Sequence, residues 1–170
     1  MAGQCGTSAR RARRLAVALG GALVLYFLVP VSVLAQGTAL MLYSKKGGYD
    51  DVRFDLQNAI IGRGLTVDFN GQISKMLERT SVDVGSARSI YKQAEYFTFC
   101  SAKLSRTTME ADPVNVGFCP YVVFIYETAA SPGTIHVGYR RPHLQGSAES
   151  KAALEAVETL LDSIVKDAVK

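Results

Sequence analysis

The sequence predicts an α+β domain built on a small mixed sheet. Segments with the two-residue period of strands alternate with segments that have the 3.6-residue period of helices. One strand-helix-strand crossover is expected in the middle of the chain, followed by a hairpin and a long C-terminal helix. No internal repeat interrupts this order. We therefore expect residues 36 to 170 to form a single domain.

A basic, then apolar, then small-residue segment opens the chain. Residues 10 to 14 read RRARR, residues 15 to 34 carry no charge, and Val33 and Ala35 stand where a signal peptidase reads small side chains. These parts are typical of a secretory signal peptide, so we expect cleavage after Ala35 and a periplasmic or secreted product. Left uncleaved, the run would anchor the chain in a membrane, although Pro30 interrupts it. The arginine pair before it leaves twin-arginine export open beside general export.

The net charge of +4 arises in this leader. Four of the nineteen Lys and Arg residues lie within residues 10 to 14, so removal of the leader leaves fifteen basic and fifteen acidic side chains. A neutral domain offers no broad basic surface to phosphate groups, and nucleic-acid binding is excluded from the expected functions. Contact with a membrane is expected only through the leader.

The first half of the domain is expected to alternate strands and helices. A strand from Ala39 to Tyr43 comes first, and Asp50 is expected to cap a helix that ends at Arg63, between two glycines. The remaining elements of this half are, in order, a half-buried strand from Leu65 to Phe69, a short helix from Ile73 to Leu77, and a polar surface loop from Thr80 to Ser89.

The second half holds the crossover, the hairpin and the last helix. A strand from Glu95 to Cys100 leads into a helix that Ser101 opens and that ends near Asp112, because the next residue is proline. Tyr121 to Glu127 is β-branched and aromatic, which predicts a central strand covered on both faces. The last two elements are a hairpin strand from Thr134 to Tyr139 and a helix from Ala148 to Ala168 with an apolar stripe.

Two cysteines, Cys100 and Cys119, remain after the leader is removed. Export and the even number favour a disulfide. A simple crossover to a parallel strand opposes it, since it would separate the two residues by about 15 Å, whereas a disulfide needs Cα atoms within about 7 Å. A loop from Pro113 to Phe118 that doubles back toward Cys100 would allow the bond. As a free thiol at a helix N-terminus, Cys100 would have a lowered pKa and would suit a nucleophile or a metal ligand.

Few other side chains suit a cofactor. His136 faces away from its aliphatic strand neighbours and Met109 lies off the apolar face of its helix, so both join Cys100 as candidate ligands for haem or copper. Each also fits an ordinary structural role, in the sheet or in the core. Arg140 and Arg141 are a candidate anion contact. The sequence contains no C-x-x-C, G-x-S-x-G or H-E-x-x-H motif, and no catalytic residue is assigned.

The run FTFCSAKLSRTTMEADPVNVGFCPYVVFIYE, followed by IHVGYRRP, resembles the domain of unknown function 302 family. The points of resemblance are Phe99-Cys100, the helix after Ser101, Asp112-Pro113, Pro120 and the segment from Ile135 to Pro142. The resemblance covers most of the mature chain. It implies an α+β fold that is often dimeric, and it links exported members to sulfur or redox metabolism and to haem binding.

Three functions follow from these features. The leading hypothesis is a small exported binding or redox-accessory domain that holds haem, a metal or another small molecule, with Cys100, Met109 or His136 as ligand. The second is a thiol enzyme that acts on small sulfur compounds with Cys100 as its nucleophile. The third is a structural homodimer without a cofactor, whose cysteines are buried or bridged.

Overall fold

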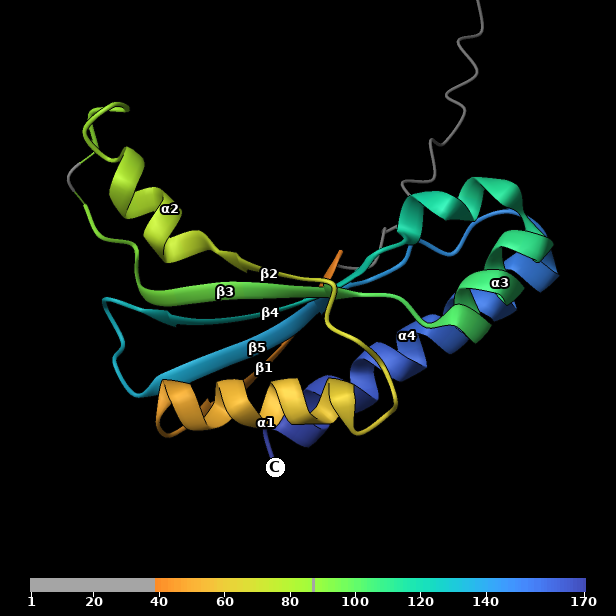
Figure 1. Cartoon of the computed structure of the whole chain (residues 1–170), viewed down its shortest axis with the longest axis horizontal. Coiled ribbons are helices and arrows are strands. Elements are labelled where there is room, and N and C mark those ends of the chain that lie inside the picture. Colours follow the sequence, from red (N-terminus) through yellow and green to blue (C-terminus); the bar gives the residue numbers. More distant parts are fainter. Residues whose placement is uncertain (1–38, 87) are drawn as a thin grey trace, which may run out of the picture. The chain divides into compact units, whose positions relative to one another are not determined.

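The computed structural model describes residues 39–86 and 88–170, so the predicted leader and its cleavage site after Ala35 lie outside the described residues. Figure 1 shows the elements. In chain order they are β1 (Leu40–Lys46), α1 (Tyr49–Ile61), β2 (Phe69–Gln72), α2 (Ile73–Thr80), β3 (Tyr91–Phe99), α3 (Ala102–Ala111), the 3-10 helix η1 (Pro113–Phe118), β4 (Tyr121–Thr128), β5 (Thr134–Arg140) and α4 (Ala148–Ala168).

The five strands form one sheet in the order β1-β5-β4-β3-β2, and every neighbouring pair is antiparallel. The predicted α+β class, the hairpin of β4 and β5, and the long last helix are confirmed. The expectation of a mixed sheet with a parallel crossover is wrong. The strands on either side of α3 are antiparallel neighbours, with Phe99 opposite Tyr121. The reason is η1, which folds the chain back so that β4 starts where β3 ends.

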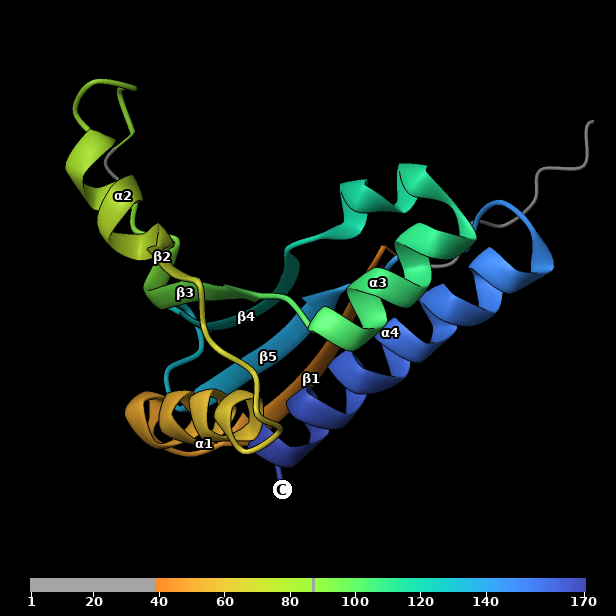
Figure 2. The ribbon, with the colours of Figure 1, turned by 45° about the vertical axis from the view of Figure 1, so that its right-hand side comes forward.

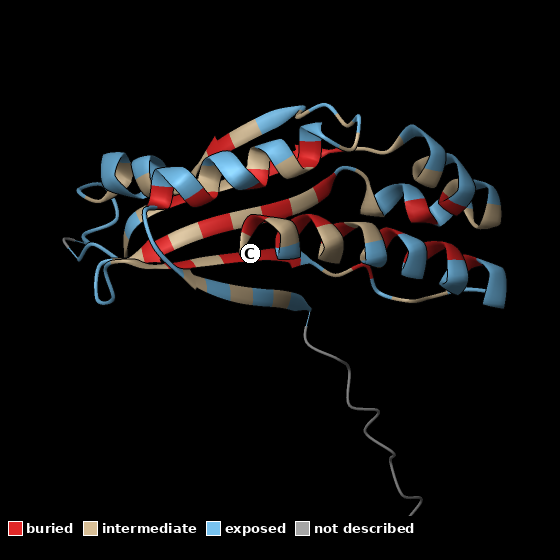
Figure 3. Ribbon diagram, turned by 90° about the horizontal axis from the view of Figure 1, so that it is seen from below, coloured by how far each residue is buried: buried red, intermediate tan, exposed pale blue. Residues whose placement is uncertain are grey.

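One face of the sheet packs against α1 and α4 (Figure 3). Along β4, Tyr121, Val123, Ile125 and Glu127 are buried and the residues between them are half-buried. The predicted stripe of α4 packs onto this buried side, where each fully buried aliphatic side chain contributes about 1.5–3 kcal/mol to folding. The expectation that β4 is covered on both faces is therefore wrong, because helices cover only one.

Several element boundaries differ from those expected. β1 extends to Lys46 because it pairs with β5 as far as Thr134. The helix α1 has Gly48 at its N-cap, and Asp50 lies in the first turn without capping it. The second strand was predicted from Leu65 to Phe69, but it is β2, which begins at Phe69. Phe69 pairs with Thr98 near the end of β3, so the residues before it extend beyond that end. The helix α3 begins and ends as predicted, with Ser101 accepting a hydrogen bond from the Leu104 N–H.

The helix α2 follows β2 without an intervening residue and stands away from α1 and α4 (Figure 2). The helix α3 lies instead beside α4. Within the described ranges, no helix combines the length and the apolar character needed to cross a bilayer. Within residues 39–86 and 88–170, the second face of the sheet has no helix packed over it, and the edge of β3 that β2 leaves unpaired lies beside α2.

Candidate functional site

Cys100 and Cys119 form a disulfide, with an S–S distance of 2.03 Å and a Cα–Cα distance of 6.3 Å. The sequence left open a simple crossover, which forbids the bond, and a loop that doubles back toward Cys100, which allows it. The structure has the second arrangement. The loop is η1, which begins at the Asp112 cap and brings Cys119 back to the start of α3. The bridge takes up the free thiol on which a Cys100 nucleophile would depend.

The predicted haem ligands do not form one site. Cys100 is bonded to Cys119, and Met109 lies half-buried near the end of α3. His136 lies opposite Tyr126, which is five residues along β4 from Tyr121, the partner of Phe99, or about 17 Å at about 3.3 Å per residue. No haem could contact all three side chains, so haem binding stays a prediction from the family resemblance. Within the described ranges, no three His, Cys, Asp or Glu side chains gather to hold a metal.

The two arginines of the predicted anion contact do not act as a pair. Arg141 Nε lies 2.7 Å from the Glu158 carboxylate on α4, while Arg140 is exposed at the end of β5. The cavity that both border has a volume of about 40 Å³. This space is too small for an organic anion, and the Arg141 guanidinium serves as a structural tie between β5 and α4.

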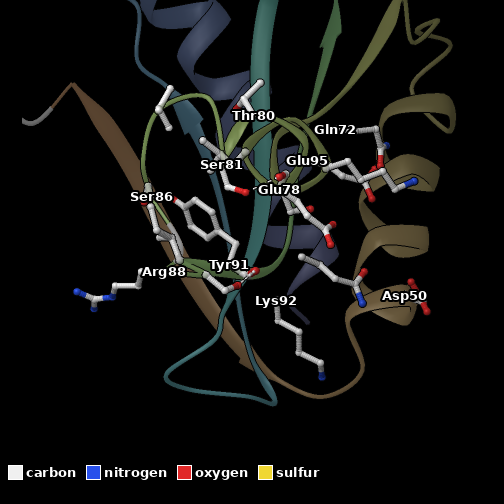
Figure 4. Close-up of a pocket in the computed structure, with 17 residues that line it drawn as sticks. Asp50, Gln72, Glu78, Thr80, Ser81, Ser86, Arg88, Tyr91, Lys92 and Glu95 are labelled. Atoms are coloured by element: carbon white, nitrogen blue, oxygen red, sulfur yellow. Dashed lines mark hydrogen bonds between the residues drawn. The ribbon is translucent and has the colours of Figure 1, made fainter.

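A pocket with a volume of about 790 Å³ lies between α2 and β3. We call it the slot. One wall is formed by α2 and the loop after it, the other by Tyr91, Lys92, Gln93 and Glu95 of β3, and Asp50 of α1 stands at its rim. Figure 4 shows Asp50 and Arg88 on opposite sides of this space. Its volume falls within the range of about 300–1,000 Å³ typical of small-molecule sites.

A fixed carboxylate forms part of the slot wall. The side chain of Glu95 is only 10% exposed, and its Oε2 lies 2.9 Å from Arg53 Nε. Asn70 Nδ2 donates to the same oxygen at 3.0 Å, and Gln72 Nε2 donates to Asn70 Oδ1 at 2.5 Å. Within the described residues, no hydrogen bond reaches Glu95 Oε1. The carboxylate is therefore held in place by α1 and β2 and keeps one oxygen for a donor in the slot.

A buried hydroxyl lies close to this carboxylate. The Tyr49 hydroxyl at the start of α1 has no hydrogen-bond partner within residues 39–86 and 88–170. Burial, and next the nearby charge of Glu95, raise the pKa of Tyr49. The phenol is therefore neutral at physiological pH. It adds a polar group to the set formed by Arg53, Asn70 and Glu95.

Glu127 at the end of β4 holds the neighbouring Lys92. Its carboxylate is buried, accepts a hydrogen bond of 2.7 Å from the Gly133 N–H, and lies 3.3 Å from Lys92 Nζ. These two donors lower its pKa, the Gly133 N–H more than Lys92. Glu127 thus fixes the β4–β5 turn and draws the Lys92 ammonium away from the edge of β3.

The second face of the sheet, which we call the open face, is apolar and aromatic. Its largest side chains are Leu40, Leu42, Phe69, Tyr96, Phe124 and Tyr126. Phe124 lies over Gly138, and Tyr96 lies over Gly71, where a Cβ would come within 2.6 Å and 2.0 Å of the respective rings. The glycines let the rings spread over neighbouring strands, and the open face is smooth as a result.

His136 belongs to the open face. Its ring stacks on Tyr126 with 4.7 Å between centroids, and its Nδ1 lies 2.8 Å from Ser44 Oγ. These contacts match the structural role that the sequence allowed for this residue, and they place it apart from the slot.

None of the residues that line the slot was predicted to have a functional role. Glu95 carried a signal, because it shares the strand parity of Phe97 and Phe99, and a charged residue among inward-facing aromatics points to a held carboxylate. Asp50 and Lys92 carried none, since their place in the slot depends on how distant elements meet.

The fold can be assigned to a known protein family. The family model described as "Domain of unknown function DUF302" matches residues 42–168. The chain belongs to this family. A solved structure described as an uncharacterized conserved DUF302 protein from Bacillus stearothermophilus is similar at a TM-score of 0.64 and 13% identity, covering 77% of this chain and 98% of that one. A search of curated proteins finds no match.

The resemblance seen in the sequence is thus confirmed, and the DUF302 match covers the sheet from Leu42 of β1 onward, the disulfide and the slot. The likeness to the solved structure shows the fold alone.

The disulfide gives a first prediction. Intact mass of the mature chain after alkylation in denaturant should show no added group without reductant and two added groups with it. Because the bridge closes a loop with a sequence separation of 19, the double variant Cys100→Ser with Cys119→Ser should lose about 3 kcal/mol of unfolding free energy. Two alkylated thiols without reductant would show that the bridge is absent.

The Glu127 carboxylate gives a second prediction. Its pKa is lower in the folded chain than the unfolded value of about 4.3, so its contribution to stability is present at neutral pH and is lost as the pH falls below about 4. Glu127→Gln should lose about 1–3 kcal/mol of unfolding free energy at pH 7, and less at pH 3. Urea unfolding at both pH values measures this.

The control for this prediction is Glu110→Gln, which breaks an exposed pair with Arg106 and should change stability by less than about 0.5 kcal/mol. An equal loss for Glu127→Gln at pH 7 and pH 3 would contradict the assignment, since it would mean that the ionised form is not the one stabilised.

Proposed function

We propose that this DUF302 chain is an exported binding domain that takes a small polar molecule in the slot between α2 and β3. Export rests on the leader pattern of residues 10 to 35. The observation that carries the binding role is the Glu95 carboxylate, which is nine-tenths covered and held in place by Arg53 and Asn70. A charge fixed in this way is ready for a ligand without first having to be ordered.

The slot offers donors and acceptors of both signs. Acidic side chains are supplied by Asp50, Glu78 and Glu95, and basic ones by Lys75, Arg88 and Lys92, the last of which already pairs with Glu127. A balanced set of charges favours a polar ligand that carries both hydrogen-bond donors and acceptors over a simple anion or cation. Binding, rather than a reaction, is what these residues support.

Two neighbouring residues of α2 allow a matched test of the slot. Leu77 lines it and Met76 does not, yet their side chains are 37% and 38% exposed. Leu77→Arg should fill the slot and lower the affinity for its ligand at least tenfold, whereas Met76→Arg should bind as the parent chain does. Glu95→Gln should also weaken binding, because the amide removes the charge.

The measurement is calorimetric titration with a panel of amino acids, polyamines and dicarboxylates, after a thermal-shift screen. The proposal expects at least one saturable binder whose affinity falls in Leu77→Arg and not in Met76→Arg. A panel without any binder, or a binder that is insensitive to Leu77→Arg, would contradict the proposed function.

We also propose that the chain forms a homodimer through the open face. Eight residues of β4 span about 26 Å, and five strands at about 4.8 Å span about 20 Å. The outline of such a face encloses about 500 Å², which places it toward the small end of interface sizes, below the roughly 800 Å² that each partner buries in a standard interface. The charged Lys46 and Arg140 lie at opposite ends of the β1–β5 pair, so the centre of the open face is uncharged, as in interface cores.

A charge placed at the centre of the open face tests the dimer. Leu42→Lys should give a monomer in light scattering coupled to size exclusion, since the lysine would have to be buried between two copies. The matched control is Ile61→Lys at the end of α1, which is as exposed as Leu42 (52% against 47%) and lies outside the open face. A parent chain that stays monomeric at about 100 μM would contradict this proposal.

A further inference from the structure

The slot has a feature that points to the class of its ligand, namely an unpaired strand edge. The strand β2 covers only part of β3, from Glu95 opposite Gln72 to Thr98 opposite Phe69. Tyr91, Gln93 and Ala94 of β3 are paired with β4 on their other edge. The ladder between β2 and β3 stops abruptly because the chain turns into α2 at Ile73.

The unpaired edge faces the slot. Tyr91, Lys92 and Gln93 all line it, and the opposite wall is α2 with its following loop. Alternate residues of a strand turn their backbone N–H and C=O groups toward each edge, and such groups bond to water or to a partner. Within the described residues, the loop reaches this edge with one hydrogen bond, from Ser89 Oγ to the Tyr91 carbonyl at 3.1 Å. The carbonyls of Tyr96 and Thr98 point toward β2, so Gln93, which has the opposite parity, directs its backbone groups toward β4. The backbone groups of Lys92 and Ala94 are left for a ligand.

The unpaired edge of β3 has room for a short added strand but not for a long one. The register of β3 shifts between Tyr91 and Gln93, which is a bulge, and bulges discourage sheets from joining edge to edge. A segment of four extended residues spans about 13 Å, about the length of edge that β2 leaves unpaired. The ammonium of Lys92, which would hinder an incoming strand, is bound to Glu127.

From these observations we infer that the slot takes a short extended peptide segment, which adds to the free edge of β3 as a continuation of β2. The inference rests on the proposed function. Main-chain hydrogen bonds to Lys92 and Ala94 supply affinity in this mode of recognition, and side-chain contacts supply selectivity. The carboxylates of Glu95 and Glu78 are placed to receive a basic group of the peptide, and the ammonium of Lys75 is placed to receive an acidic one.

The experiment is calorimetric titration of the full mature chain with a pool of acetylated, amidated pentapeptides that carry Val, Thr or Tyr at their central positions and one Lys and one Glu at their outer positions. We expect saturable binding that falls at least tenfold when alternate peptide amides are N-methylated, because the methyl group removes a main-chain donor. Binding should be lost in Leu77→Arg and kept in Met76→Arg, which locates it in the slot.

The other outcomes separate this inference from the proposed function. Equal affinity for N-methylated and unmodified pentapeptides would show that the ligand does not bind as an added strand. Binding of non-peptide molecules in the slot, without binding of pentapeptides, would show that the ligand is not a peptide. In both cases the slot would remain a binding site. Pentapeptides that bind equally to Leu77→Arg would overturn the inference as well. Failure of both the pentapeptides and the small-molecule panel to bind would overturn inference and proposed function together.

Discussion

One face of the antiparallel sheet is buried beneath α1 and α4, and this one-sided burial determines which other parts of the sheet stay exposed. The apolar side chains of β4 and β5 that point to the helices are fully buried, as is the stripe of α4. Because both long helices are used on this face, the other face keeps its aromatic residues half-exposed. The short helix α2 is left to stand beside β3 rather than over the sheet.

The candidate site lies where β2 is too short to pair with the whole of β3. The strand β2 has four residues and β3 has nine, so, among the residues that the structure describes, part of β3 lacks a strand partner on the α2 side. The polar residues beside this gap are held by elements from different parts of the chain. Arg53 comes from α1, Asn70 from β2, and Glu127 fixes Lys92 from β4. The slot is thus a product of tertiary structure, and its carboxylate is fixed before any ligand arrives.

Local signals predicted most elements but not the way they meet. Ser101 and Pro113 marked the two ends of α3, and the stripe of α4 was clear in its periodicity. The parallel crossover was wrong because nothing in the local pattern of residues 113 to 118 shows that they form a returning helical turn. For the same reason the disulfide stayed open until that turn was seen. The slot could not be predicted, since it depends on the register at which β2 stops against Glu95.

The claim at the centre of this account is that part of β3 has a free edge in the ligand-free chain. Native-state hydrogen exchange, read residue by residue by NMR, tests it most directly. The account predicts that amides of β4, which has neighbours on both sides, exchange only through global unfolding, whereas slot-facing amides of Lys92 and Ala94 exchange at least about a hundredfold faster. Uniform protection along β3, equal to that of β4, would contradict the account, because the edge would then be paired.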